Sequence, residues 1–400
     1  MLPNLSLYIK SFGASNQEVG WVMASFAIGL LGFRPRMAHF SDTKGRKPAL
    51  FIGVSVIAIA PLLYLTVQFL PQVTIPLSLF GWQTNLKSAV LFLALFRAFH
   101  GLSIAAFSTA YTAAVADMAP PQHRGELIGY ASLASPTGLA LGPALGGFLQ
   151  GDFVAAFLTM TALGLVGVLC VFASREPVRS PMPADMPLTQ PKNNFDFWKL
   201  LLQPSVRIPA LILFMVGIAF GSMVAFVPLK VDDLGLAVNI GLIYTMSAIA
   251  SFSIRMLAGK ASDQLGRGRF ISSGLIFYSL SMFVLWQSDT PEMFLLGGAL
   301  QGCGSGTLIP IIAALMADRS RPGERGLTFG LCLTGFDLGI ALAGPVMGRI
   351  ADVTSYDSIF VLAGTMTLLG LLIFITTSSK DLAHSIRFAL RGGRDVYAIK

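Results

Sequence analysis

Arg97 and His100 lie inside an apolar stretch, where an ionisable side chain needs a reason to be present. If that stretch crosses a membrane, a charge near its middle costs roughly 2.5–3.5 kcal/mol, so Arg97 should face a watery cavity or a partner. His100 follows three residues later and shares a helix face with Arg97. An imidazole can change its charge near neutral pH. The pair predicts a site where Arg97 contacts an anionic substrate group or modulates a proton site. A neutral His100 bonded to a backbone carbonyl is an equally open interpretation.

Asp337 is an acidic residue in a comparable position, inside an apolar stretch. It lies near the middle of a second apolar stretch, between Gly335 and Gly339, and the aligned position of the first half is Pro136. Burial and a nearby cation act on the proton affinity of a carboxylate in opposite directions, which can poise it for proton exchange. We expect Asp337 to have a proton or substrate role, and the alternative is a structural acid bonded to backbone or hydroxyl groups.

The composition explains why such residues are rare. Of the 400 residues, 54% are hydrophobic and 12% are charged, whereas soluble chains carry about 25% charged residues. Apolar stretches of about 20 residues recur along the chain, a pattern typical of an all-α polytopic membrane protein. The net charge of +8 comes without interleaved aromatic and basic residues, so we expect no nucleic-acid partner. The four histidines are scattered without metal-ligand spacing, and no nucleotide-binding loop occurs, so no metal, cofactor or enzymatic activity is expected.

Apolar periodicity predicts eleven helices and four regions. The helices are near 17–38, 48–70, 88–116, 124–150, 153–174, 205–229, 238–259, 269–287, 292–317, 325–350 and 355–378. The regions are an N-terminal bundle (1–174), a Pro-rich cytoplasmic linker (175–204), a C-terminal bundle (205–379) and a basic cytoplasmic tail (380–400). If the loop before Pro48 is cytoplasmic, 23 of the 28 Lys and Arg fall on that side and four on the other. Basic residues stay inside, so the carboxyl terminus is predicted to be cytoplasmic.

The two halves repeat each other. Arg34, Asp42, Gly45 and Arg46 recur 221 residues later as Arg255, Asp263, Gly266 and Arg267. Asp117 and Arg124 recur 201 residues later as Asp318 and Arg325, and Gly142-Pro143 recurs as Gly344-Pro345. Parallel repeats predict a transporter of two helical bundles with a substrate site near the midplane between them. In the repeat, the segment from Leu5 to Gly13 matches the end of the helix near 205–229. The rest of the corresponding helix would fall before Met1, so the first of twelve helices is predicted to be missing. A misassigned start or a truncation is favoured over a natural eleven-helix protein.

These motifs resemble those of a known family. Ala38-x-x-x-Asp42-Thr43-Lys44-Gly45-Arg46-Lys47 resembles the loop signature of the major facilitator superfamily, with Ala38 and Thr43 departing from it. Arg97-x-x-His100-Gly101 resembles its fourth-helix motif, with His100 where Gln is common. Gly138-x-x-x-Gly142-Pro143-x-x-Gly146-Gly147 matches the motif of its drug and metabolite antiporters. The resemblance implies two six-helix bundles that rock about a central site.

The resemblance also assigns roles to the repeated loops. It implies a cytoplasmic gating latch formed by Asp42, Gly45, Arg46, Lys47, Asp117 and Arg124, with Asp263, Gly266, Arg267, Asp318 and Arg325 as the second copy. The alternative is that these basic residues only enforce topology. The Gly138 to Gly147 motif is implied to seal the cavity, and its spacing alone predicts close helix packing, with Pro143 bending the helix.

The sequence therefore predicts a secondary transporter that exports a small organic molecule in exchange for protons. A proton-coupled uptake symporter for a sugar or organic anion remains the alternative on the same fold. A membrane-embedded enzyme or receptor, or a chain inactive without its first helix, are the other hypotheses. We expect a monomer in the lipid bilayer of the plasma (inner) membrane, driven by the proton gradient.

Overall fold

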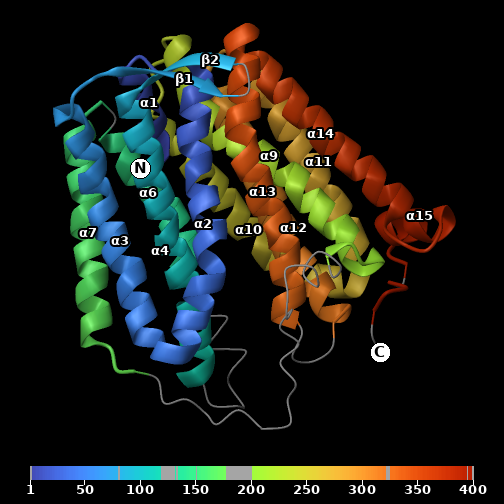
Figure 1. Cartoon of the computed structure of the whole chain (residues 1–400). Helices are drawn as coiled ribbons and strands as arrows, with labels where there is room; N and C mark the ends of the chain where they lie inside the picture. The colour runs from blue at the N-terminus through green and yellow to red at the C-terminus, as the bar shows by residue number, and fades with distance from the viewer. Residues whose placement is uncertain are drawn as a thin grey trace. The chain divides into compact units, whose positions relative to one another are not determined.

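The computed structural model describes residues 2–79, 82–118, 131, 134–149, 151–176, 201–320, 325–393 and 395–398. Within them the chain is helical apart from one hairpin (Figure 1). The elements of the first part of the chain are α1 (Leu2–Ser11), α2 (Asn16–Lys44), α3 (Arg46–Thr66), η1 (Val67–Phe69), β1 (Thr74–Leu79), β2 (Trp82–Lys87), α4 (Ser88–Met118), α6 (Ala134–Phe148) and α7 (Phe153–Ala173). Those of the second are α9 (Pro204–Asp233), α10 (Ile240–Leu265), α11 (Arg267–Trp286), α12 (Pro291–Asp318), α13 (Arg325–Val353), α14 (Tyr356–Thr377) and α15 (Leu382–Arg391).

Nine of the helices in the described residues are long and apolar enough to cross a membrane. Their outward surfaces are apolar too: on α7, side chains such as Leu163, Leu169 and Phe172 are more than half exposed. A large exposed apolar surface is unfavourable in water and suits lipid. The prediction of an all-α polytopic membrane protein is confirmed.

The chain forms two compact units. The first contains Met1–Gly138, Leu145–Met182 and Gly344–Val353, and the second contains Leu139–Ala144, Pro183–Ala343 and Thr354–Lys400. Two helices are therefore divided, since the middle of α6 belongs to the second unit and the end of α13 to the first. Each unit is described below by itself.

Three elements lie outside the predicted helices. Residues between the predicted helices 48–70 and 88–116 form the antiparallel hairpin β1–β2, in register from Thr74 opposite Lys87 to Leu79 opposite Trp82. Helix α1 contains most of the segment from Leu5 to Gly13, which matches the end of α9 in the repeat. Helix α15 lies in the predicted tail. All three are too short for the stretch length that identifies a membrane span.

Glycines set the closest helix contacts of each unit. In the first unit, a Cβ added to Gly29 would lie 1.9 Å from the carbonyl oxygen of Ala98, and one added to Gly101 would lie 2.3 Å from that of Phe26. Helices α2 and α4 can approach this closely only because both positions lack a side chain. In the second unit, Gly302 and Gly306 of α12 contact the backbone of α10 in the same way. The contact in the first unit holds the part of α4 that carries Arg97 and His100 against α2.

Candidate functional site

Arg97 and His100 form the centre of a buried cluster in the first unit. Arg97 is 4% exposed and His100 is 7% exposed. The Arg97 guanidinium lies over the ring of Phe26, 4.5 Å from its centroid, and the His100 ring meets the edge of the same ring at 5.5 Å. Nη1 of Arg97 lies 3.5 Å from Nδ1 of His100. The predicted pair is therefore brought together, with an aromatic ring from α2 as its third member.

Tyr64 of α3 completes the cluster, although the motifs did not single it out. Its hydroxyl lies 3.0 Å from Nδ1 of His100, and its side chain is fully buried. The Tyr64 carbonyl accepts a hydrogen bond of 2.9 Å from the hydroxyl of Tyr8 in α1. Four helices of the first unit thus fix this site.

The geometry assigns the role of the His100 ring. Nδ1 faces the Arg97 guanidinium, which can only donate, and the Tyr64 hydroxyl, which can donate to it. Nδ1 therefore acts as the acceptor, which leaves the ring neutral with its proton on Nε2. The structure places Tyr64, rather than a backbone carbonyl, as the partner of this nitrogen.

Arg97 keeps unused hydrogen-bonding capacity. Its Nε is buried and has no hydrogen-bond partner, and among the described residues no carboxylate forms an ion pair with its guanidinium. The Phe26 ring and the neutral imidazole stabilise the cation only in part. A buried donor and an unneutralised charge together form a site suited to an anionic oxygen.

Asp337 lies on α13 in the second unit, not in the unit of Arg97. It is 8% exposed. A Cβ on Gly335 or Gly339 would lie 2.2 Å from a carbonyl oxygen of α9, so the face of α13 with these glycines abuts α9. Asp337 is two residues from each glycine and therefore projects from the opposite side of the helix. It is a buried carboxylate turned away from the closest helix contact of its own unit.

The second unit carries a polar pair that corresponds to His100 and Tyr64. Gln301 follows His100 by 201 residues, the offset of the second part of the repeat, and Gly302 likewise follows Gly101. Gln301 is 2% exposed; its amide donates to the Tyr278 hydroxyl at 3.0 Å and its carbonyl accepts from Ser247. The repeat offset could have identified Gln301 from the sequence, whereas nothing in the motifs pointed to Tyr278.

The first of the two repeated charged loops turns at Gly45. This residue has a φ of 120°, which favours glycine, between the ends of α2 and α3. Arg46 bonds Asp42 at 2.5 Å and the Ser41 hydroxyl at 3.1 Å. The loop thus forms an internal network of the acidic and basic residues that the motif predicted.

Glu176 is an unpredicted member of that loop. Its carboxylate accepts hydrogen bonds from the backbone N–H groups of Arg46 and Lys47, at 2.7 and 2.9 Å. These N–H groups belong to the first turn of α3, where a negative charge is also favoured by the helix dipole. The Lys47 ammonium in turn donates to the carbonyls of Phe172 and Ser174 at the end of α7. The start of the predicted linker is therefore bonded to the first charged loop.

The second charged loop repeats the glycine turn and the arginine–serine contact of the first. Gly266 has a φ of 94°, and Arg267 bonds Ser262 at 3.2 Å, five residues before it, just as Arg46 bonds Ser41. Arg267 also pairs with Asp318 at 2.9 Å. This ion pair joins the loop to the end of α12, the position at which the repeat places Asp117 in α4.

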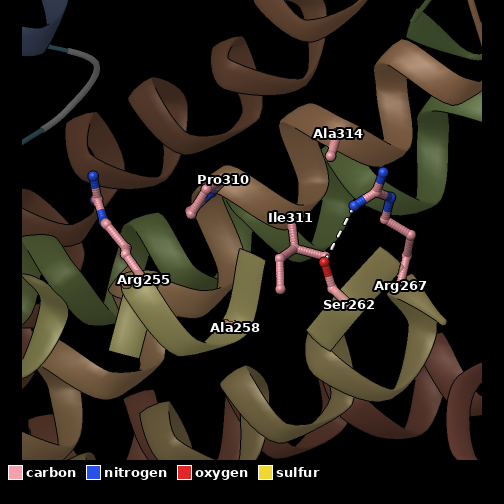
Figure 2. Close-up of a pocket in the computed structure, with 8 residues that line it drawn as sticks. Arg255, Ala258, Ser262, Arg267, Pro310, Ile311 and Ala314 are labelled. Atoms are coloured by element: carbon pink, nitrogen blue, oxygen red, sulfur yellow. Dashed lines mark hydrogen bonds between the residues drawn. The ribbon is translucent and has the colours of Figure 1, made fainter. Parts of the chain in front are cut away.

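A cavity of about 260 Å³ lies beside this second loop, between α10 and α12. Figure 2 shows Arg255 on one side of it and the bonded Ser262 and Arg267 on the other, with Pro310 and Ile311 between them. Arg255, the repeat partner of Arg34, has a buried Nε without a hydrogen-bond partner. The second copy of the motif therefore borders a cavity.

Several predicted residues fall outside what the structure describes. Arg124 lies outside the described residues, as do the side chains of Asp117, Pro143, Asp263 and Arg325. In the antiporter-type motif, a Cβ on Gly138 or Gly142 would meet no described atom within 4 Å. The Gly146 carbonyl accepts a bond of 3.0 Å from Asn4, and Gly147 is buried. Close packing through the first two glycines is thus not present among the described residues.

Long apolar helices, repeated charged loops and buried ionisable residues define a multi-pass membrane transporter of small molecules. The model of the Major Facilitator Superfamily matches residues 1–258 and 210–391, and the chain belongs to that family. Its members are transporters and not enzymes, as the sequence predicted.

Two similar relatives are named for export and for drug resistance. The chain is 26% identical to the staphylopine export protein of Staphylococcus aureus, over 89% of this chain and 86% of that protein. It is 25% identical to multidrug resistance protein 2 of Bacillus subtilis, over 93% and 89%. Among solved structures, the inward-open xylose transporter XylE of E. coli superposes with a TM-score of 0.71 at 15% identity, over 96% of this chain and 93% of that one. The last similarity concerns the fold alone.

Proposed function

We propose that this protein is a secondary active transporter that exports a small organic molecule in exchange for protons, by alternating access. Two kinds of observation support export: one relative named above is an export protein by name and the other a multidrug resistance protein, and the Gly138 to Gly147 motif resembles that of antiporters. We further propose that it works as a monomer in the inner membrane with its carboxyl terminus in the cytoplasm, because basic residues concentrate on that side.

The observation that carries the proposal is the buried Arg97, which lacks a carboxylate partner among the described residues. A cation in an apolar unit is retained where it contacts substrate or coupling ion. In our proposal Arg97 takes an anionic oxygen, and His100, held through Nδ1 by Tyr64, presents its Nε2–H as a further donor. Asp337, the buried carboxylate of α13, is the proposed carrier of the exchanged proton.

The two charged loops are proposed to act as latches of the cytoplasmic side. Each has a glycine turn with positive φ, an arginine bonded to the serine five residues before it, and an acidic partner. Opening the cavity to the cytoplasm would require these ion pairs to be exchanged. Because the partly exposed pairs are each worth no more than about 1 kcal/mol, that exchange is compatible with a reversible latch.

Inverted membrane vesicles that carry the chain provide the test. The vesicles are energised, their interior pH is followed with a pH-sensitive dye, and a panel of amphipathic drugs, sugars and organic acids is added. An exported substrate releases protons from energised vesicles with the wild type and not with Arg97→Ala at equal expression. No proton release with any compound would refute proton-coupled export.

The alternative is a proton-coupled uptake symporter for an organic anion, which the unneutralised Arg97 cation also favours. Intact cells distinguish the two directions. Accumulation of a labelled organic acid or sugar that depends on this chain and is abolished by a protonophore would replace the export proposal with the symport one.

A further inference from the structure

Helix α15 carries an apolar stripe that no other described element covers. Leu382, Ile386 and Leu390 recur every four residues and are 56, 37 and 47% exposed. At 3.6 residues per turn this spacing lines one face of the helix. The neighbouring flank of the helix is docked, since Ser385, Phe388 and Ala389 are buried.

Basic residues border the stripe. Arg387 and Arg391 each follow a stripe residue by one position, about 100° further around the helix, and both are exposed. Among the described residues no carboxylate pairs with either of them. The two acidic residues of the tail are already engaged, Asp381 with His384 and Asp395 with Arg319. The exposed surface of α15 is therefore apolar with a cationic edge.

The fold fixes the direction in which this surface points. α15 begins at Leu382, directly after the end of the membrane-crossing helix α14 at Thr377, so it lies at the level of the membrane surface. Arg269 and Ser272 of α11 donate to the carbonyls of Leu390 and Ala389, at 3.1 and 3.0 Å. These bonds hold one flank of α15 to the second unit and leave the stripe facing outward.

The end of the tail locks that position. Gly392 caps α15 with a φ of 71°, and a Cβ there would lie 2.2 Å from the carbonyl oxygen of Leu265. Asp395 then forms a two-pronged ion pair with Arg319, at 2.7 and 3.0 Å, in which the Arg319 side chain is 1% exposed. Tail residues Phe388, Gly392 and Asp395 line a cavity of about 320 Å³ together with Gly266 and Arg267 of the second loop.

We propose that α15 is an anionic-lipid contact site: its stripe of Leu382, Ile386 and Leu390 enters the interfacial region of the bilayer, and Arg387 and Arg391 bind lipid phosphates. Short helices with an apolar face and a basic edge lie in the membrane interface, and anionic lipids attract them. In the orientation proposed above, the lipids are those of the cytoplasmic leaflet. Since the same tail borders the second loop, bound lipid stabilises the docked tail beside Arg267.

Hydrogen exchange of the full chain in nanodiscs tests this. The amides of 382–391 are compared in discs of phosphatidylcholine alone and in discs that also contain phosphatidylglycerol. We expect stronger protection with phosphatidylglycerol, and its loss in R387Q/R391Q. At about 1 kcal/mol per basic side chain near an anionic surface, the loss should approach thirty-fold in the protection factor.

Two further variants serve as controls. R36Q/K44Q removes two charges from exposed positions of α2 and should leave the protection of α15 unchanged. L382S/I386S should lower protection in both kinds of disc, because it removes apolar contact and not charge. Equal protection of α15 with and without phosphatidylglycerol, or protection that survives in R387Q/R391Q, would overturn the proposal. Neither outcome depends on the direction of transport.

Discussion

Replacing Arg97 by methionine should abolish transport without unfolding the protein. Methionine has a similar length and no charge, so it fills the space of the side chain and can still contact the ring of Phe26. If Arg97 were retained for stability instead, its replacement by methionine would destabilise the protein. The substitution therefore separates a functional cation from a structural one.

The expected change in stability follows from the contacts of Arg97. A central charge costs roughly 2.5–3.5 kcal/mol in the membrane. The ring of Phe26 returns about 2 kcal/mol of this when the pair is desolvated. Among the described residues no carboxylate neutralises the guanidinium, and Nε has no hydrogen-bond partner. The hydrogen bond to Nδ1 of His100 returns about 1 kcal/mol more. Methionine should therefore change the free energy of unfolding by less than about 1 kcal/mol in either direction.

The assay compares unfolding in detergent with transport in inverted vesicles, for the wild type, Arg97→Met and Arg97→Lys. Lysine is the matched control because it keeps the charge without the planar guanidinium. We expect Met to be stable and inactive, and Lys to retain partial transport. A loss of more than about 2 kcal/mol of stability in Met, or transport at the wild-type rate, would refute the reasoning.

Three other substitutions test the second unit. Asp395→Asn leaves Arg319 buried without its counter-ion, so it should lower the free energy of unfolding by about 3–5 kcal/mol and release the tail. Thermal unfolding and limited proteolysis after α15 measure these two effects, and unchanged unfolding would contradict the buried pair. Gly302→Ala places a Cβ 2.0 Å from a backbone oxygen of α10, so it should separate α10 from α12 and lower the melting temperature; a wild-type melting temperature would show that the contact is looser. The backbone N–H of His384 bonds Asp381 and lowers the pKa of that carboxyl below its ordinary 3.8. The contribution of this cap is thus full above pH 3.8 and lost as the pH falls through the lowered pKa, so the protection of α15 should depend on pH in this range, and Asp381→Ala should remove that dependence.

The sequence predicted the long helices well because each is an apolar stretch that ends at charge, Gly or Pro. The predicted helices 153–174 and 355–378 correspond to α7 and α14 within one residue at each end. Short amphipathic elements such as α15 carry no stretch of membrane-spanning length, so the same criterion overlooked them.

The candidate site was predicted in part. The spacing of Arg97 and His100 was enough to place them on one face, and the structure joins them. Tyr64 and Glu176 were not predicted, because their roles depend on tertiary contacts between residues 36 and 130 positions apart in the chain. Gln301 could have been found from the sequence, since it follows His100 by 201 residues, the same distance that separates Asp117 from Asp318.

Transport in proteoliposomes tests the central claim most directly. The purified chain is reconstituted, a pH gradient is imposed, and uptake of a labelled compound identified in the vesicle panel is measured. Proton-coupled antiport predicts accumulation only when the interior is acidic, collapse on addition of a protonophore, and no accumulation with Arg97→Met. Equal flux with and without the gradient would contradict the account.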